Sequence, residues 1–191
     1  MPPAFLKDEI MKAIVLLLLA LFFPFLNVNF FQQASCGFAS TYLLGVTQST
    51  HGDFAELEFK AILGNGKTLM DIHNLFFGYE IQASIRKAKL VAEKISGVNT
   101  SKLDIIYSFK ANVDSLDGPS AGASIAIATI AAILNKTLRK DVLITAGINE
   151  NGMLTPVSNV LTKAKIAKKL GARLLLVPPG QSYTIDYKRE E

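Results

Sequence analysis

Apolar and polar positions divide the chain into an N-terminal apolar segment and a longer region of alternating elements. Residues 13–26 carry no charged side chain, and Lys7 and Lys12 precede them. This arrangement is typical of a signal peptide, and an apolar run that continues to Phe31 could just span a bilayer. A buried helix is the alternative. We predict a flank at 1–12, a signal peptide or membrane anchor at 13–31, and a connector at 32–40.

Beyond residue 40, period-two alternation predicts strands and helical spacing predicts helices. Residues 64–66 read Gly-Asn-Gly, which predicts a hairpin between the strands on either side. Strands are predicted at 42–48, 54–63, 67–72, 103–109, 142–146, 153–157 and 174–177, the last of them buried. Helices are predicted at 79–95, 119–134 and 160–170. A block of strands followed by mixed helices and strands predicts one α+β domain at 41–180, with a tail at 181–191.

Charge and composition narrow the classes of function. The 191 residues carry a net charge of +4, and Cys36 is the only cysteine. The lysines are spread along the chain, which indicates solvated faces rather than a nucleic-acid-binding surface. A lone cysteine excludes an intrachain disulfide, and Gln33 fits poorly with a lipid-attachment site at Cys36. No metal-ligand spacing occurs, so neither a metal nor a cofactor is expected.

Residues 117–122 read Asp-Gly-Pro-Ser-Ala-Gly and introduce the second predicted helix. We expect Asp117 to cap this helix, with proline in its first turn. Ser120 and Ala121 would then lie among unpaired backbone N–H groups at the positive end of the helix dipole. Such donors stabilise the oxyanion that forms when a hydroxyl attacks a carbonyl. The alternative is an ordinary capped helix start.

Lys163 is the candidate base for Ser120. Four lysines lie on the last predicted helix, and only Lys163 falls within its apolar face, between Val160 and Ala167. Burial lowers the pKa of a lysine and favours the neutral amine that can take a proton from serine. A lysine that reaches solvent along its apolar stem is the alternative.

Rival catalytic groups are weaker. His51 with Asp53, and His73, belong to no recognisable motif. Ser84 and Lys87 have the Ser-x-x-Lys spacing of penicillin-interacting enzymes, but the partner motifs of those enzymes are absent.

These residues resemble the proteolytic domain of Lon proteases over about residues 41–179. The nucleophile motif at 117–122 and the interval to Lys163 match that family's Ser–Lys dyad, and segments 145–147 and 152–157 resemble its intervening strands. The resemblance implies that Ser120 is the nucleophile and Lys163 the general base. It also implies that Thr145 holds the lysine amine by a hydrogen bond and that Asp117 borders the site.

Two positions depart from the family pattern. Ser158-Asn159 stands where the family usually has Gly-Gly before the lysine helix, and Ala111 stands where many members have glutamate. No phosphate-binding loop occurs, so unfolding of substrates driven by ATP is not expected from this chain alone.

The leading hypothesis is an ATP-independent serine endopeptidase that hydrolyses unstructured proteins or peptides. Its catalytic domain would be membrane-anchored through the N-terminal segment, or secreted, and would lie outside the cytoplasm. The resemblance also implies a homo-oligomeric ring. The alternative is a catalytically weak or inactive domain that acts as a membrane-tethered binding or scaffold module.

Overall fold

The computed structural model of the chain describes residues 37–46, 52–71 and 75–183. The predicted flank, the predicted signal peptide or anchor and most of the predicted connector lie outside these ranges. None of the helices within these ranges has the length and apolar character needed to cross a membrane.

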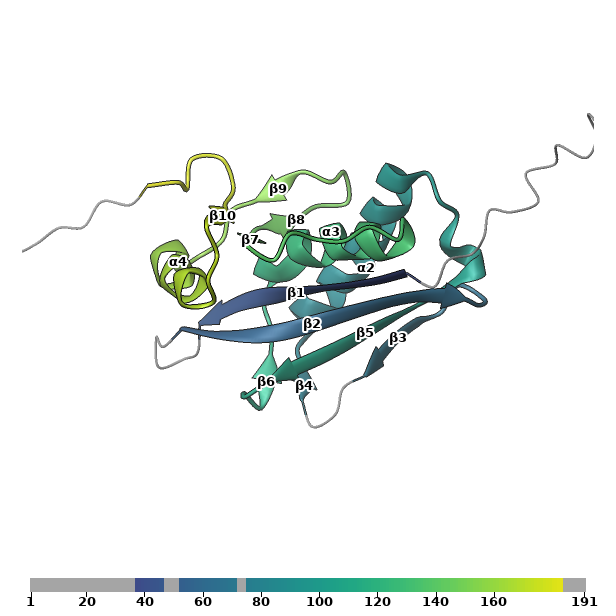
Figure 1. Ribbon diagram of the computed structural model, residues 1–191, viewed down its shortest axis with the longest axis horizontal. Coiled ribbons are helices and arrows are strands. Elements are labelled where there is room, and N and C mark those ends of the chain that lie inside the picture. Colours follow the sequence, from purple (N-terminus) through teal and green to yellow (C-terminus); the bar gives the residue numbers. More distant parts are fainter. Residues whose placement is uncertain (1–36, 47–51, 72–74, 184–191) are drawn as a thin grey trace, which may run out of the picture. The chain divides into compact units, whose positions relative to one another are not determined.

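A four-stranded sheet is the largest element of the fold (Figure 1). Its strand order is β1 (Gly37–Val46), β2 (Gly52–Leu63), β5 (Leu103–Ala111) and β3 (Thr68–Asp71). The pairs β1–β2 and β2–β5 are antiparallel, and β3 is parallel to β5. β1 begins within the range 32–40 that the sequence had assigned to the connector, five residues ahead of the predicted strand.

Two helices pack on one face of this sheet (Figure 1). They are α2 (Tyr79–Ser96) and α3 (Gly122–Ile133). The alternation of β2 confirms the predicted pattern, because Ala55, Leu57, Phe59 and Ala61, at every second position, are all buried in the core. α3 is buried around most of its circumference, as its composition predicted. α2 begins at the predicted residue and ends one residue after the predicted end.

The predicted hairpin between β2 and β3 is wrong. β3 pairs with β5, which lies between β2 and β3 in the sheet. The Asp104 carboxylate on β5 accepts hydrogen bonds from the backbone of Asn65 and Lys67 at 2.8 Å each. The turn is therefore anchored to β5. Four buried apolar residues make β5 a central strand, whereas β3 is mostly exposed at the edge.

The remaining described strands form three two-stranded sheets. β4 (Phe76–Phe77) is parallel to β6 (Ser115–Leu116), β8 (Gly147–Ile148) is antiparallel to β9 (Leu154–Thr155), and β7 (Val142–Ile144) is parallel to β10 (Leu174–Leu176). Short 3₁₀ turns lie at η2 (Thr100–Lys102) and η3 (Pro119–Ala121). The fold mixes helices with several sheets, and its main sheet is largely antiparallel, in agreement with the predicted α+β class.

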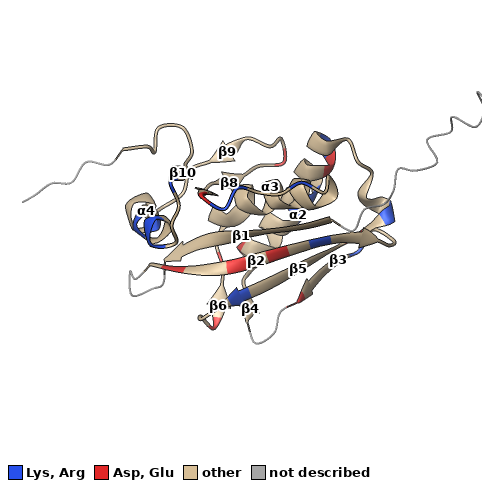
Figure 2. Ribbon diagram, viewed as in Figure 1, with Lys and Arg blue, Asp and Glu red and all other residues tan. Residues whose placement is uncertain are grey.

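Helix α4 (Val160–Lys169) lies between β7 and β10 in the chain. Its apolar side packs in a small second cluster of buried residues that is separate from the main core: Leu44, Leu143, Ile166 and Ala167. β10 was predicted to be buried, but Leu174 and Leu176 are exposed. The reason is that β10 pairs only with β7, at one side of the fold, instead of entering the main sheet. Charged residues are spread over several elements, with basic residues on α4 and both signs along β2 (Figure 2).

Candidate active site

Ser120 lies in the 3₁₀ turn η3, directly ahead of α3. The turn begins at Gly118, whose φ of 106° is a conformation that glycine adopts at little cost. Pro119 then occupies the first position of the turn. A side chain at Gly122 would approach Ile148, with its Cβ 2.9 Å from Ile148 Cγ2. Gly118 thus permits the turn that leads into α3, and Gly122 permits close packing of α3 against β8.

Asp117 does not cap α3, which corrects the prediction. Its carboxylate oxygen Oδ1 accepts hydrogen bonds from the backbone N–H groups of Glu80 at 3.0 Å and Ile81 at 3.4 Å. Those residues form the first turn of α2, where Gly78 at the N-cap has no side chain to supply a cap. Asp117 therefore caps α2 from a distant part of the chain, and among the described residues no side chain caps α3.

The segment around Ser120 is joined to the segment around Thr145 by three hydrogen bonds. Ala146 donates its N–H to the Ser120 carbonyl at 3.1 Å, and Ala123 donates its N–H to the Ala146 carbonyl at 3.0 Å. Ser124 donates its hydroxyl to the Ile144 carbonyl at 2.6 Å. The structure thus brings together the predicted nucleophile and the predicted threonine segment.

Lys163 is buried on α4, as its place on the helix predicted. Its side chain is 3% exposed, whereas Lys165, Lys168 and Lys169 on the same helix are exposed. Burial lowers the pKa of the Lys163 amine because the charged form loses its solvation. Among the described residues, no hydrogen bond or ion pair to the Lys163 side chain compensates for that loss.

Thr145 and Lys163 both lie within three residues of one packing contact between β7 and α4. β7 and β10 are parallel, and α4 precedes β10 in the chain. Leu143 on β7 packs with Ile166 on α4. Thr145 follows Leu143 by two residues, just past the end of β7, and Lys163 precedes Ile166 by three residues on α4.

The hydrogen bond that the resemblance implied between Thr145 and Lys163 is not formed in the structure. Thr145 is 1% exposed, and its hydroxyl oxygen has no hydrogen-bond partner among the described residues. A buried hydroxyl without a hydrogen-bond partner lowers the stability of the folded state. Such groups are uncommon in native structures and call for a structural or functional explanation. No hydrogen bond joins the Ser120 hydroxyl to the Lys163 amine within the described ranges either.

Asn159, one of the two departures, stands at the N-cap of α4 with φ of 57° and ψ of 35°. This left-handed conformation explains why glycine suits the position, and asparagine tolerates it better than most residues. The departure from Gly-Gly is therefore compatible with the start of the helix that carries Lys163.

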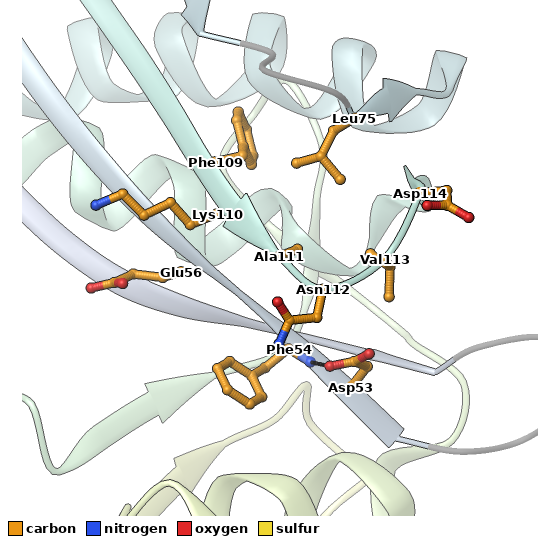
Figure 3. Close-up of a pocket in the computed structure, with 10 residues that line it drawn as sticks. All are labelled: Asp53, Phe54, Glu56, Leu75, Phe109, Lys110, Ala111, Asn112, Val113 and Asp114. Atoms are coloured by element: carbon orange, nitrogen blue, oxygen red, sulfur yellow. Dashed lines mark hydrogen bonds between the residues drawn. The ribbon is translucent and has the colours of Figure 1, made fainter.

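Ala111, the other departure, lines an open pocket of about 550 Å³ at the ends of β2 and β5 (Figure 3). Asp53, Phe54 and Asn112 lie on one side of Ala111 in this view, and Phe109 and Leu75 lie on another. Replacement of glutamate by alanine at this position leaves a shorter side chain at the wall of the pocket.

The rival residues gain no support. His51 and His73 lie outside the described residues. Ser84 is buried in α2, 4% exposed, within a helix that packs on the main sheet. No cluster of three or more potential metal-ligating side chains occurs in the described part of the chain. Ser124 was not singled out from the sequence, although its position one helical turn after Ser120 is a usable signal.

Comparison with known proteins agrees with this arrangement. The sequence model of the Lon protease (S16) C-terminal proteolytic domain matches residues 47–187. The chain is 33% identical over 89 residues to Lon protease 2 of Bacillus subtilis and 32% identical over 95 residues to the archaeal Lon protease of Thermoplasma volcanium. These matches cover 47% and 50% of the chain. A longer match, 28% identical over 135 residues and 66% of the chain, is to the Lon protease of Haemophilus influenzae.

The chain spans only 14% to 16% of the length of these three relatives. The family match, by contrast, covers most of the chain and includes Ser120, Thr145 and Lys163. The chain therefore belongs to the family of Lon protease (S16) C-terminal proteolytic domains.

Proposed function

We propose that the chain is a serine endopeptidase in which Ser120 is the nucleophile and Lys163 the general base. The observation that carries the proposal is the burial of Lys163. A lysine residue that is 3% exposed, and whose amine has a lowered pKa, is suited to be neutral and to accept a proton. The three hydrogen bonds between the Ser120 and Thr145 segments support it, because they join the proposed nucleophile to the segment that follows β7, the strand whose Leu143 packs with Ile166 on α4.

In the proposed reaction, the Ser120 hydroxyl attacks the carbonyl carbon of the scissile peptide bond while Lys163 accepts the hydroxyl proton. The amine of the leaving fragment takes this proton from Lys163 as the C–N bond breaks, which leaves an acyl-enzyme. Water then attacks the ester carbonyl and gives a proton to Lys163, and a tetrahedral intermediate forms. Cleavage of its bond to the Ser120 oxygen releases the carboxyl product, and Lys163 returns the proton to Ser120.

The backbone around Ser120 is suited to stabilise the oxyanion. The N–H groups of Ser120 and Ala121 lie in the turn ahead of α3, near the positive end of the helix dipole. Since the Asp117 carboxylate is engaged at α2, it does not compete for them. Thr145 would orient the Lys163 amine once the side chains adjust to a bound peptide. Its buried hydroxyl, which has no hydrogen-bond partner among the residues that the structure describes, supports this role.

None of these steps consumes ATP, so we propose ATP-independent hydrolysis of unstructured proteins or peptides. We also propose that residues 13–31 direct the domain to a membrane or out of the cytoplasm, and that the domain assembles into a homo-oligomeric ring. Membrane fractionation of the full chain and light scattering of the purified protein test these two proposals.

The test of the dyad is cleavage of fluorescently labelled β-casein, an unstructured protein, by the full chain. Ser120→Ala and Lys163→Ala should each abolish cleavage, whereas Lys165→Ala, a change of an exposed lysine on the same helix, should leave it unchanged. Since only the neutral amine accepts a proton, kcat/KM should rise with pH through the lowered pKa of Lys163. Cleavage that persists in Ser120→Ala would refute the proposal. An inactive wild-type chain that still binds casein would favour the scaffold alternative.

A further inference from the structure

The peptide unit between Ile144 and Thr145 is held from both sides. Its N–H, on Thr145, donates to the Leu176 carbonyl of β10 at 3.0 Å. Its C=O, on Ile144, accepts the Ser124 hydroxyl of α3 at 2.6 Å. The N–H and C=O of one trans peptide point in opposite directions, so this single plane is fixed between α3 and β10.

The two elements that hold this peptide, α3 and β10, each lie next to a proposed catalytic group in the chain. α3 begins directly after the turn that holds Ser120, and Ser124 follows Ser120 by about one helical turn. β10 follows α4, which holds Lys163. Thr145, whose buried hydroxyl has no hydrogen-bond partner in the part of the chain that the structure describes, contributes the N–H of this peptide.

Ser124 is an unusual residue for its place. It is 2% exposed in the first turn of α3, a helix composed mainly of alanine and isoleucine, and a buried hydroxyl there needs a partner. Serine and threonine inside helices often bond to the carbonyl one turn earlier in their own helix, as Thr129 does with Ile125 at 2.7 Å. Ser124 bonds instead to a different element, and its partner carbonyl directly precedes Thr145.

We propose that Ser124 is a positioning residue for catalysis. Its hydroxyl orients the Ile144–Thr145 peptide so that the Thr145 hydroxyl can form a hydrogen bond with the Lys163 amine. The same bond fixes the position of that peptide relative to Ser120. This inference rests on the proposed Ser–Lys mechanism. Ser124 itself does not touch the reacting atoms. Its effect therefore passes through Thr145.

The first test compares kcat and KM for casein cleavage by Ser124→Ala, Ser124→Thr and wild type. Ser124→Ala should lower kcat about 10- to 100-fold with little change in KM, because misplacement of a catalytic group by about 1 Å costs a factor of this order. Ser124→Thr keeps the hydroxyl and should recover most of kcat. Thr129→Val is the matched control, since it removes a buried hydroxyl from the same helix away from the site.

A double-mutant cycle with Thr145→Val separates positioning from general destabilisation. If Ser124 acts through Thr145, Ser124→Ala should change kcat less than twofold in the Thr145→Val background. Multiplicative losses in the double variant, or an equal loss of kcat in Thr129→Val, would overturn the inference. Absence of casein cleavage by the wild-type protein would instead refute the proposed function. Failure of this inference and failure of the proposed function are therefore distinguishable.

Discussion

The two proposed catalytic groups rest on apolar cores of very different size. Ser120 precedes α3, which packs with α2 on the main sheet in a core of more than twenty buried residues. Lys163 lies on α4, whose buried support is the small second cluster around Ile166 and Leu143. The proposed nucleophile therefore directly precedes a helix of the larger core. The proposed base depends on the smaller cluster, so we expect that local opening of α4 would displace it without unfolding the rest.

The largest expected effect comes from the main core. Phe59 is fully buried on β2 and makes an edge-to-face contact with Tyr107, with ring centroids 5.2 Å apart. Phe59→Ala should lower the free energy of unfolding by about 3–5 kcal/mol. Urea unfolding measures this loss. Phe54→Ala, on the exposed face of the same strand, is the control and should cost far less. Equal losses in the two variants would contradict the assignment of the core.

The second expected effect separates activity from global stability. Ile166 is 6% exposed and belongs to the small cluster. Ile166→Ala should lower the free energy of global unfolding by about 2 kcal/mol, the low end for such a change, because the site can relax near the surface. The loss of kcat should be larger than this stability loss explains, since α4 loosens while α3 stays in place. Amide hydrogen exchange should show faster exchange in α4 only.

A matched control for α4 is Leu161→Ala, because Leu161 is 49% exposed on the same helix. It should alter neither kcat nor exchange appreciably. If Ile166→Ala sped exchange equally in α3 and α4, the two regions would form one cooperative unit and the comparison would fail.

The smallest effect concerns the stability cost of burying Lys163, the proposed base. The folded-state pKa of Lys163 lies below its ordinary value of 10.5 because of burial, so the unfolded chain binds the proton more tightly. The free energy of unfolding should therefore rise with pH between the lowered pKa and about 10.5. Lys163→Met should remove this rise and stabilise the neutral-pH protein by about 1.4 kcal/mol for each unit of lowering.

Urea unfolding of wild type and Lys163→Met at a series of pH values measures this difference. Lys165→Met, at an exposed position, should reproduce the pH dependence of wild type. A Lys163→Met variant that is less stable than wild type at neutral pH would mean that the buried amine has a stabilising partner.

Local patterns predicted the elements that depend on local contacts. The bounds of α2, the inward face of β2 and the burial of Lys163 all follow from periodicity, because one face of each element packs on a neighbour. The nucleophile motif was recognisable for the same reason, since glycine and proline set its backbone within a few residues. The family itself was recognisable from the motif and its interval to Lys163.

Contacts between distant residues were not predictable from the pattern. Asp117 was assigned to the wrong helix, because its actual partners in α2 precede it by more than thirty residues. The turn after β2 resembled a hairpin, although Asp104 draws it to β5. Ser124 lay within an apolar helix with no sign of its partner, since that partner is a backbone carbonyl that carries no sequence signal.

The pairing of β7 with β10 also sets an order of events during protein synthesis. The hydrogen bond from the Thr145 N–H to the Leu176 carbonyl can form only after Leu176 has emerged from the ribosome. Until then, a nascent chain can fold the main sheet and expose Ser120 while α4 has no second strand to close against. The proposed dyad would therefore be assembled only after β10 has been synthesised.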